Sequence, residues 1–245
     1  MNLHNIKHLV AGGCSQTSDG IGGVPPSAIS PEGGCSFVEQ QGVTPAIPNS
    51  WASFVAKNLN VSSFVNLATG GHGNEMIAST MIDLLSRYEY DPASTLILFN
   101  VTHAHRLDIP CDFLHPDKSP FVPWTKELLP YSYLDIDCKI QKKIHENIGN
   151  EQVKEMTKLR LISLFNFLEN QKFKYKFLFG DDFSNSYALN FLMCNPNRID
   201  LEQYNNIREF ALGNKVNKDS THPNQLGHQM IANLVLQELS KDCST

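Results

Sequence analysis

A serine near the start of the chain stands where an enzyme nucleophile is expected. Residues 8–11 form a short apolar run, and Gly12 and Gly13 follow it directly before Cys14 and Ser15. The run predicts a buried strand, and the glycines let the backbone turn sharply where that strand ends. Open α/β folds bind ligands at the carboxyl ends of their strands, so Ser15 is a candidate nucleophile at that edge. A serine in this position is also a common helix N-cap, and the stretch alone leaves both readings open.

A second group of residues, near the C-terminus, could activate that serine. Asp219 precedes His222 by three residues, on a segment expected to lead into the last helix. In a serine hydrolase a histidine takes the serine proton and a carboxylate orients the histidine. The sequence therefore predicts a triad of Ser15, His222 and Asp219. Asp181 and Asp182 follow another predicted strand and compete for the carboxylate role, but the Asp-x-x-His spacing is local and favours Asp219.

Four separated segments together resemble a known family. They cover residues 13–17, 65–71, 96–100 and 219–223. In this order they are similar to the motifs of the SGNH (GDSL-type) hydrolases, although Cys14 stands where that family usually has Asp. The resemblance implies an α/β fold with three layers, α/β/α, and a mainly parallel, flavodoxin-like central sheet. It also implies a serine-type carboxylic ester hydrolase.

The resemblance also implies an oxyanion hole, which would stabilise the charge that develops on the ester oxygen. The expected donors are the backbone N–H groups of Ser15 and Gly71 and the side-chain amide of Asn100, with Gly70 as the alternative to Gly71. Glycine lets a backbone N–H approach such an oxygen closely, and an Asn amide can donate to it. The simpler alternatives are an ordinary strand-to-helix turn at Gly71 and a loop-capping role for Asn100.

Two long segments without clear periodicity are expected to border the substrate. They lie near residues 18–49 and 101–150, and they are rich in polar residues and proline. Candidate substrate-binding residues are His72, His103 and Arg106, although His72 is equally consistent with a solvated turn and Arg106 with a structural ion pair. The polar composition favours a short, acetyl-like acyl group on a carbohydrate or another small polar molecule.

The composition limits the remaining possibilities. The chain has 245 residues, of which 41% are hydrophobic, and a net charge of −5, so we expect a single domain over residues 1–245. Basic runs and long apolar stretches are absent from the sequence, which argues against a nucleic-acid or membrane partner. We see no signal peptide and expect a cytoplasmic protein with free thiols at its six scattered cysteines. His103, His105 and Asp108 lack a further ligand that the sequence identifies, so no metal or organic cofactor is expected.

The hydrophobic pattern predicts elements in alternation. Strands are expected at residues 8–11, 63–67, 95–99 and 174–179. Helices are expected at 51–59, capped by Ser50 and serving only to pack; from about Ile77 to Asp91-Pro92; at 151–171; less clearly at 201–212; and after Asn224. The helix at 151–171 is expected to bury a stripe formed by Met156, Leu159, Ile162, Phe165 and Leu168.

Two other functions are compatible with the same residues. An O-acyltransferase would use the same site and pass the acyl group to an alcohol instead of water. A catalytically silent module would bind a glycan or a protein partner on the same fold. The sequence does not indicate an oligomeric state.

Overall fold

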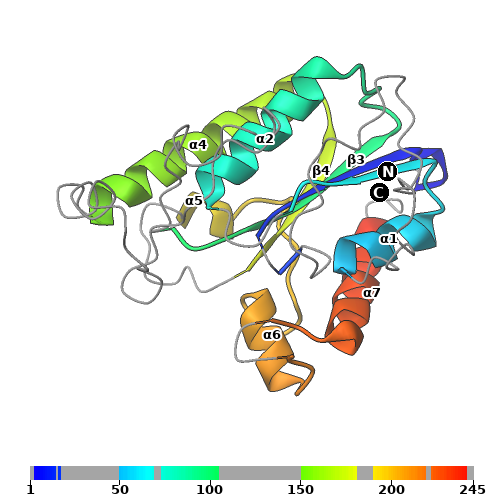
Figure 1. Cartoon of the computed structure of the whole chain (residues 1–245), viewed down its shortest axis with the longest axis vertical. Coiled ribbons are helices and arrows are strands. Elements are labelled where there is room, and N and C mark those ends of the chain that lie inside the picture. Colours follow the sequence, from blue (N-terminus) through cyan, green and yellow to red (C-terminus); the bar gives the residue numbers. More distant parts are fainter. Residues whose placement is uncertain are drawn as a thin grey trace, which may run out of the picture.

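Four parallel strands form the centre of the structure. The computed structural model describes residues 3–14, 16–17, 50–68, 73–104, 150–180, 190–218 and 222–241. The strands are β1 (His8–Gly12), β2 (Ser63–Asn66), β3 (Thr95–Val101) and β4 (Lys174–Phe179), in the spatial order β2-β1-β3-β4 (Figure 1). All seven residues of β3 are buried, because helices cover both faces of this central strand.

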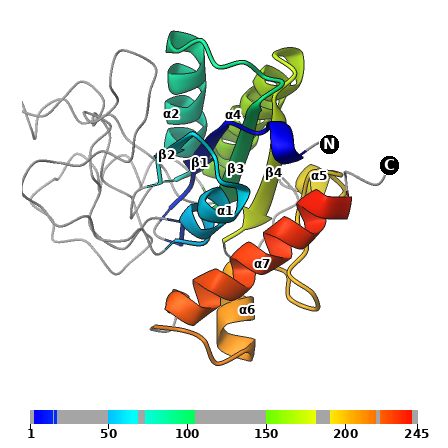
Figure 2. The same ribbon diagram turned by 90° about the vertical axis from the view of Figure 1, so that its right-hand side faces the viewer.

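Helices lie on both faces of the sheet and make three layers. On one face are α1 (Trp51–Leu59) and α7 (Gln225–Lys241), and on the other are α2 (Asn74–Arg87) and α4 (Asn150–Asn170), as Figures 1 and 2 show. Alternate residues of β3 serve the two faces: Leu96 and Leu98 join the core with α1 and α7, while Ile97 and Phe99 join the core with α2 and α4. The predicted α/β/α architecture with a parallel sheet is confirmed.

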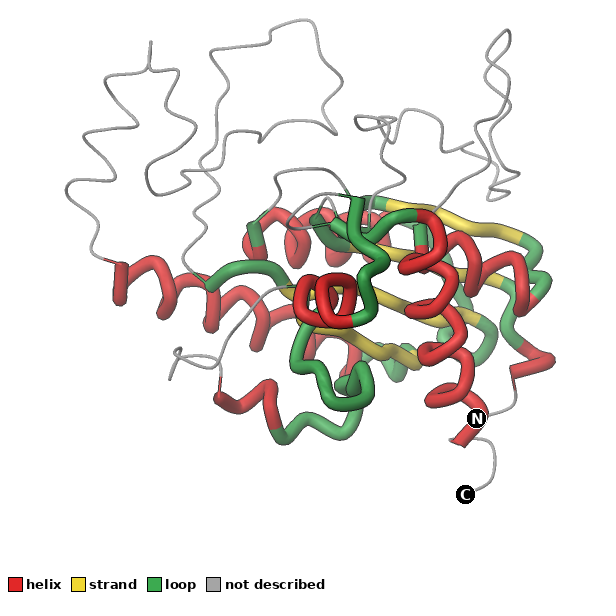
Figure 3. The backbone as a smooth tube through the Cα atoms, turned by 90° about the horizontal axis from the view of Figure 1, so that it is seen from below, coloured by secondary structure: helices red, strands yellow, loops and turns green. Residues whose placement is uncertain are grey.

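The strand order reverses at β1. From β1 the chain passes to β2 on one side and then crosses to β3 on the other side, so β1 and β3 lie next to each other in the middle of the sheet (Figure 2). Figure 3 shows the strands of the sheet side by side among the helices. The register pairs Gly12 with Phe99 and Ala11 with Asn66, which brings the ends of these strands to one edge. In open α/β sheets, ligands bind at the carboxyl ends of the strands where the order reverses.

The helix that follows β1 begins as the sequence predicts. The Ser50 hydroxyl accepts a hydrogen bond from the Ser53 backbone N–H at 3.2 Å and so caps α1. Replacing such a cap by alanine typically lowers stability by about 1 kcal/mol. Helix α2, by contrast, ends at Arg87, four residues before the Asp91-Pro92 pair that was expected to end it.

The predicted buried stripe of α4 is partly wrong. Met156 is 40% exposed and Leu159 is 62% exposed. The buried residues of this helix recur instead at steps of three and four, namely Val153, Thr157, Leu161, Leu164, Phe165 and Leu168.

Among the described residues, no helix is both long and apolar enough to span a membrane.

A short extended segment covers the outer edge of β4. The Phe177 N–H donates to Asn197 O at 3.0 Å, and the Ile199 N–H donates to Phe177 O at 2.8 Å. The Arg198 guanidinium lies over the Phe179 ring, with 5.6 Å between Cζ and the ring centroid. These contacts shield an edge that would otherwise expose unpaired backbone groups.

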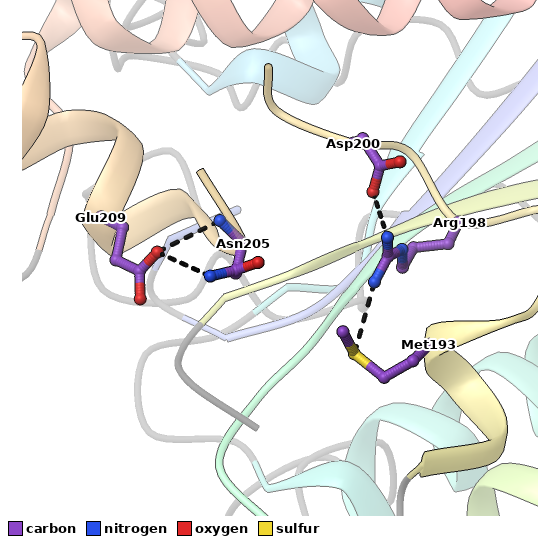
Figure 4. A network of polar contacts seen from close by, with 5 residues as sticks. All are labelled: Met193, Arg198, Asp200, Asn205 and Glu209. Atoms are coloured by element: carbon purple, nitrogen blue, oxygen red, sulfur yellow. Dashed lines mark hydrogen bonds and ion pairs between the residues drawn. The ribbon is translucent and has the colours of Figure 1, made fainter. Parts of the chain in front are cut away.

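Figure 4 shows two polar clusters near this segment: one joins it to the short helix α5 (Asn190–Met193), and the other lies at the start of α6 (Ile207–Gly213). Arg198 donates to Met193 Sδ at 3.3 Å and pairs with Asp200, while the Asn205 N–H donates to Glu209 Oε2 at 3.1 Å. Helix α6 begins six residues later than position 201, where the sequence suggested a helix, because Asn206 caps it there and residues 201–204 form a turn.

Candidate active site

The loop after β1 can approach β3 only because residue 13 is glycine. Gly13 has φ of +147°, a backbone conformation that other residues rarely adopt. A Cβ at this position would lie 1.9 Å from Asn100 Oδ1 and 2.8 Å from Thr17 Oγ1. The two glycines after the first strand were expected to permit a sharp turn, and at Gly13 this expectation is confirmed.

The Asn100 side chain, on β3, holds this loop through hydrogen bonds. Its Oδ1 accepts hydrogen bonds from the Cys14 backbone N–H at 3.0 Å and from the Thr17 hydroxyl at 2.6 Å, and its Nδ2 donates to Cys14 Sγ at 3.3 Å. The side chain is fully buried. Asn100 was expected to follow the third strand but lies inside β3, one residue before its end. Its amide is therefore at the carboxyl edge, while its role as an oxyanion donor stays a prediction.

The ends of β2 and β4 also contact the loop. The Asn66 amide donates to Thr17 O at 3.0 Å, and Asn66 Oδ1 accepts from the Ala68 N–H at 3.0 Å. Gly180, directly after β4, leaves room for two side chains, since a Cβ there would lie 2.3 Å from Gln16 Oε1 and 2.5 Å from Asn100 Nδ2. The residues on both sides of Ser15 are thus held by polar groups or close packing from all three other strands. Ser15 itself lies outside the described residues.

The backbone after β3 is fixed by the first residue of α2. Asn74 Nδ2 donates to Thr102 O at 2.8 Å and to His103 O at 3.2 Å, and Asn74 Oδ1 accepts from the Thr102 N–H at 2.9 Å. Asn74 is fully buried, and His103, a predicted substrate contact, is partly exposed beside it. The other predicted groups here, Gly70, Gly71, His72 and Arg106, lie outside the described residues. Our sequence reasoning missed Asn74, whose only signal is its place after the Gly-rich turn.

His222 lies shortly before α7, beside an isolated antiparallel bridge between Asn217 and Pro223. The Lys218 N–H donates to His222 O at 2.8 Å, and the Asn224 N–H donates to Val216 O at 2.7 Å. Asn224 then caps α7 as predicted, because its Oδ1 accepts from the Gly227 N–H at 2.9 Å. These bonds fix the backbone on each side of His222, which is partly exposed. Asp219 lies outside the described residues, as do Asp181 and Asp182.

Trp51, the first residue of α1, contacts both of these regions. Its indole N–H donates to Thr17 Oγ1 at 3.1 Å, and its backbone N–H donates to His228 Nδ1, on α7, at 3.3 Å. Burial, together with the charge of the neighbouring His222, lowers the pKa of His228 to about 4. The sequence predicts a packing helix here, and the structure adds these two hydrogen bonds to its packing role. No local sequence pattern predicts these bonds, which join residues 34 and 177 positions apart.

Comparisons with known proteins give matches in structure alone. No protein-family model matches the sequence, and no characterised protein matches it in a sequence comparison. A member of the lipolytic G-D-S-L family from Veillonella parvula is 11% identical with a TM-score of 0.45, and the match covers 94% of this chain and 96% of that one. A protein assigned as a GDSL-like lipase from Bacteroides ovatus is 12% identical with a TM-score of 0.46, over 96% and 99% of the two chains. An acetyl xylan esterase from Geobacillus stearothermophilus is 14% identical with a TM-score of 0.38, over 96% of each chain.

Proposed function

We propose that this protein is a serine esterase that hydrolyses an acyl ester. Ser15 Oγ attacks the ester carbonyl carbon, and His222 takes the serine proton. His222 returns that proton to the departing alcohol, and water then attacks the acyl-enzyme with His222 again as the base. Asp219 orients His222. The backbone N–H groups of Ser15 and Gly71 and the amide of Asn100 stabilise the oxyanion in both steps.

One observation carries this proposal. The neighbours of Ser15 are immobilised at the point where the strand order reverses, and Asn100 from the adjacent strand contributes most of the bonds. A nucleophile must be held in place to react, and a fully buried amide at this edge is suited to hold it. The two N–H groups of Trp51 donate to Thr17, in the loop that includes Ser15, and to His228, on the helix that follows His222, which supports a site shared by these two segments.

We propose a short acyl group, such as acetyl, on a carbohydrate or another small polar molecule. The support is the polar composition of residues 18–49 and 101–150, which is poorly suited to a long acyl chain. His72, His103 and Arg106 are the residues that we propose to contact the polar part of the substrate. No metal or organic cofactor takes part in these steps.

The proposal is tested by turnover of p-nitrophenyl acetate. We expect the wild-type protein to hydrolyse it and the Ser15→Ala variant to lose at least about a thousandfold in kcat. Ser62→Ala is the matched control, because Ser62 is exposed and precedes β2 at the opposite edge of the sheet. Equal turnover by wild type and Ser15→Ala would exclude Ser15 as the nucleophile.

Product analysis separates hydrolysis from acyl transfer. We expect acetate as the main product when an acceptor alcohol or sugar is added to the reaction. Transfer of most acetyl groups to the acceptor would identify the site as that of an O-acyltransferase instead.

A further inference from the structure

Trp51 uses its two N–H groups for two distant parts of the chain. The indole N–H donates to Thr17 Oγ1 at 3.1 Å, in the loop that includes Ser15. The backbone N–H donates to His228 Nδ1 at 3.3 Å, on the helix that follows His222. Trp51 is 1% exposed, so water does not compete for either bond.

We propose that Trp51 is a positioning residue, which joins the loop around Ser15 to helix α7 and so fixes how His222 meets the nucleophile. This inference rests on the esterase function proposed above. It adds to that function a residue outside the four motifs, on a helix that the sequence assigned to packing.

On the Thr17 side of the link, the donor and the acceptor of each hydrogen bond are determined. The Thr17 hydroxyl donates its proton to Asn100 Oδ1 at 2.6 Å, so an oxygen lone pair is left to accept from the indole. Asn100 Oδ1 also accepts from the Cys14 N–H at 3.0 Å. The indole N–H therefore connects to the backbone directly before Ser15 through three hydrogen bonds, each with one possible donor.

On the His228 side of the link, the donor and the acceptor are determined as well. Because Nδ1 accepts from the backbone N–H of Trp51, the neutral imidazole carries its proton on Nε2. Burial holds the pKa of His228 at about 4, so Nδ1 is unprotonated and able to accept throughout the neutral range. The first N–H groups of a helix have no partner within the helix, and here the first of them bonds a side chain from α7.

A role in packing alone would make different predictions. Trp51 and Val55 are both fully buried in the core between α1, α7 and the sheet. If Trp51 only filled that core, its replacement would act on catalysis in the same way as the replacement of Val55. The two N–H bonds set Trp51 apart, and they can be removed one at a time.

The test measures kcat and KM for p-nitrophenyl acetate in four single variants and in the double variant Trp51→Phe/His228→Leu. Trp51→Phe removes the indole donor and keeps an aromatic ring, and His228→Leu removes the acceptor of the backbone N–H. His228→Asn places an oxygen near the position of Nδ1 and is the rescue variant. Val55→Ala is the matched control, since it weakens the same core and touches neither bond. Urea unfolding of each variant identifies the conditions under which all of them are folded.

We expect Trp51→Phe and His228→Leu each to lower kcat by about tenfold or more, with KM changed by less than about twofold. Because the two bonds act in series, the double variant should lose no more than the larger single loss. His228→Asn should recover most of kcat, and Val55→Ala should keep the wild-type value.

Three results would overturn the inference: wild-type kcat in both single variants, a loss in Val55→Ala as large as theirs, or losses that multiply in the double variant. A different result tests the proposed function. If Ser15→Ala keeps wild-type turnover, the esterase proposal is wrong. If Ser15→Ala is inactive while Trp51→Phe and His228→Leu keep full kcat, only the positioning role is wrong.

Discussion

Gly13 lies directly against the side chain of Asn100, and a Cβ on Gly13 would come within 1.9 Å of Asn100 Oδ1. That oxygen accepts from both Cys14 and Thr17, so it has no space to move away without breaking those bonds. The contact joins the end of the first strand to the end of the third. It explains why the chain turns where it does, and it sets the geometry of the loop that includes Ser15.

Gly13→Ala should therefore damage both stability and activity. The left-handed backbone alone costs about 1–3 kcal/mol for a residue with a Cβ, and the overlap with Asn100 adds to it. Gly12→Ala is the matched control, because its Cβ would meet the flexible end of Met81, with Sδ at 2.6 Å. Urea unfolding should show a larger loss for Gly13→Ala than for Gly12→Ala. Equal stability of the two variants would contradict this account of the turn.

Asn100→Ala should destabilise the protein by about 2–4 kcal/mol, because the Cys14 N–H and the Thr17 hydroxyl would lose a buried partner. Asn58→Ala serves as the comparison, since Asn58 is exposed on α1 and its amide donates to Phe54 O at 2.8 Å. We expect a change below about 0.5 kcal/mol for that variant. Thermal unfolding measures both, and a stability change for Asn100→Ala as small as that of Asn58→Ala would show that the loop is held by other groups.

Gly180→Ala should lower activity more than a comparable substitution elsewhere. Its Cβ would overlap Gln16 Oε1 and the Asn100 amide nitrogen, and so would displace the groups around Ser15. Gly213→Ala creates an overlap of similar size, 2.3 Å from the Tyr204 ring, at α6. We expect kcat to fall about tenfold or more in Gly180→Ala and to change little in Gly213→Ala, when both are assayed below their unfolding temperatures. The reverse order would show that the close contact at Gly180 does not reach the site.

Stability should fall on acidification because of His228. Its folded-state pKa is about 4, mainly through burial and also through the charge of His222, against 6.5 in the unfolded chain. The unfolded state therefore takes up a proton first as the pH falls. The contribution of neutral His228 to the free energy of unfolding is complete above pH 6.5. It is lost between about pH 6.5 and pH 4, by up to about 3 kcal/mol. In His228→Asn, urea unfolding from pH 8 to pH 4 should show a shallower dependence, and an unchanged profile would contradict the assignment.

Much of the fold could be predicted from the sequence because most of its strands are short runs rich in apolar residues. Thr95–Phe99 and Lys174–Phe179 were placed almost to the residue, and the caps at Ser50 and Asn224 follow from local chemistry. The stripe expected on α4 failed for a geometric reason. Its members were spaced by three residues, and each step of three residues falls about 60° short of a full helical turn. This difference accumulates along the helix, so Met156 and Leu159 point away from the side on which Leu168 is buried.

The candidate site was only partly predictable, for a different reason. Asn100 and His222 belong to local motifs that can be read along the chain. The hydrogen bonds of Trp51 and Asn74 and the close packing at Gly180 depend on which segments meet in space. Nothing in the local pattern around Trp51 distinguishes a tryptophan that donates to distant partners from one that only packs. Similarly, Leu226 belongs to the apolar pattern of the last helix but is 55% exposed in its first turn.

The most direct test of the central claim is covalent labelling with a small fluorophosphonate, mapped by fragment mass spectrometry. We expect one adduct per chain, located on Ser15 and not on the adjacent Cys14. The adduct should be absent in Ser15→Ala and should form at least about a hundredfold more slowly in His222→Ala, because that variant lacks the base. An adduct on another residue, or hydrolysis of p-nitrophenyl acetate without any adduct on Ser15, would contradict the proposal that Ser15 is the nucleophile.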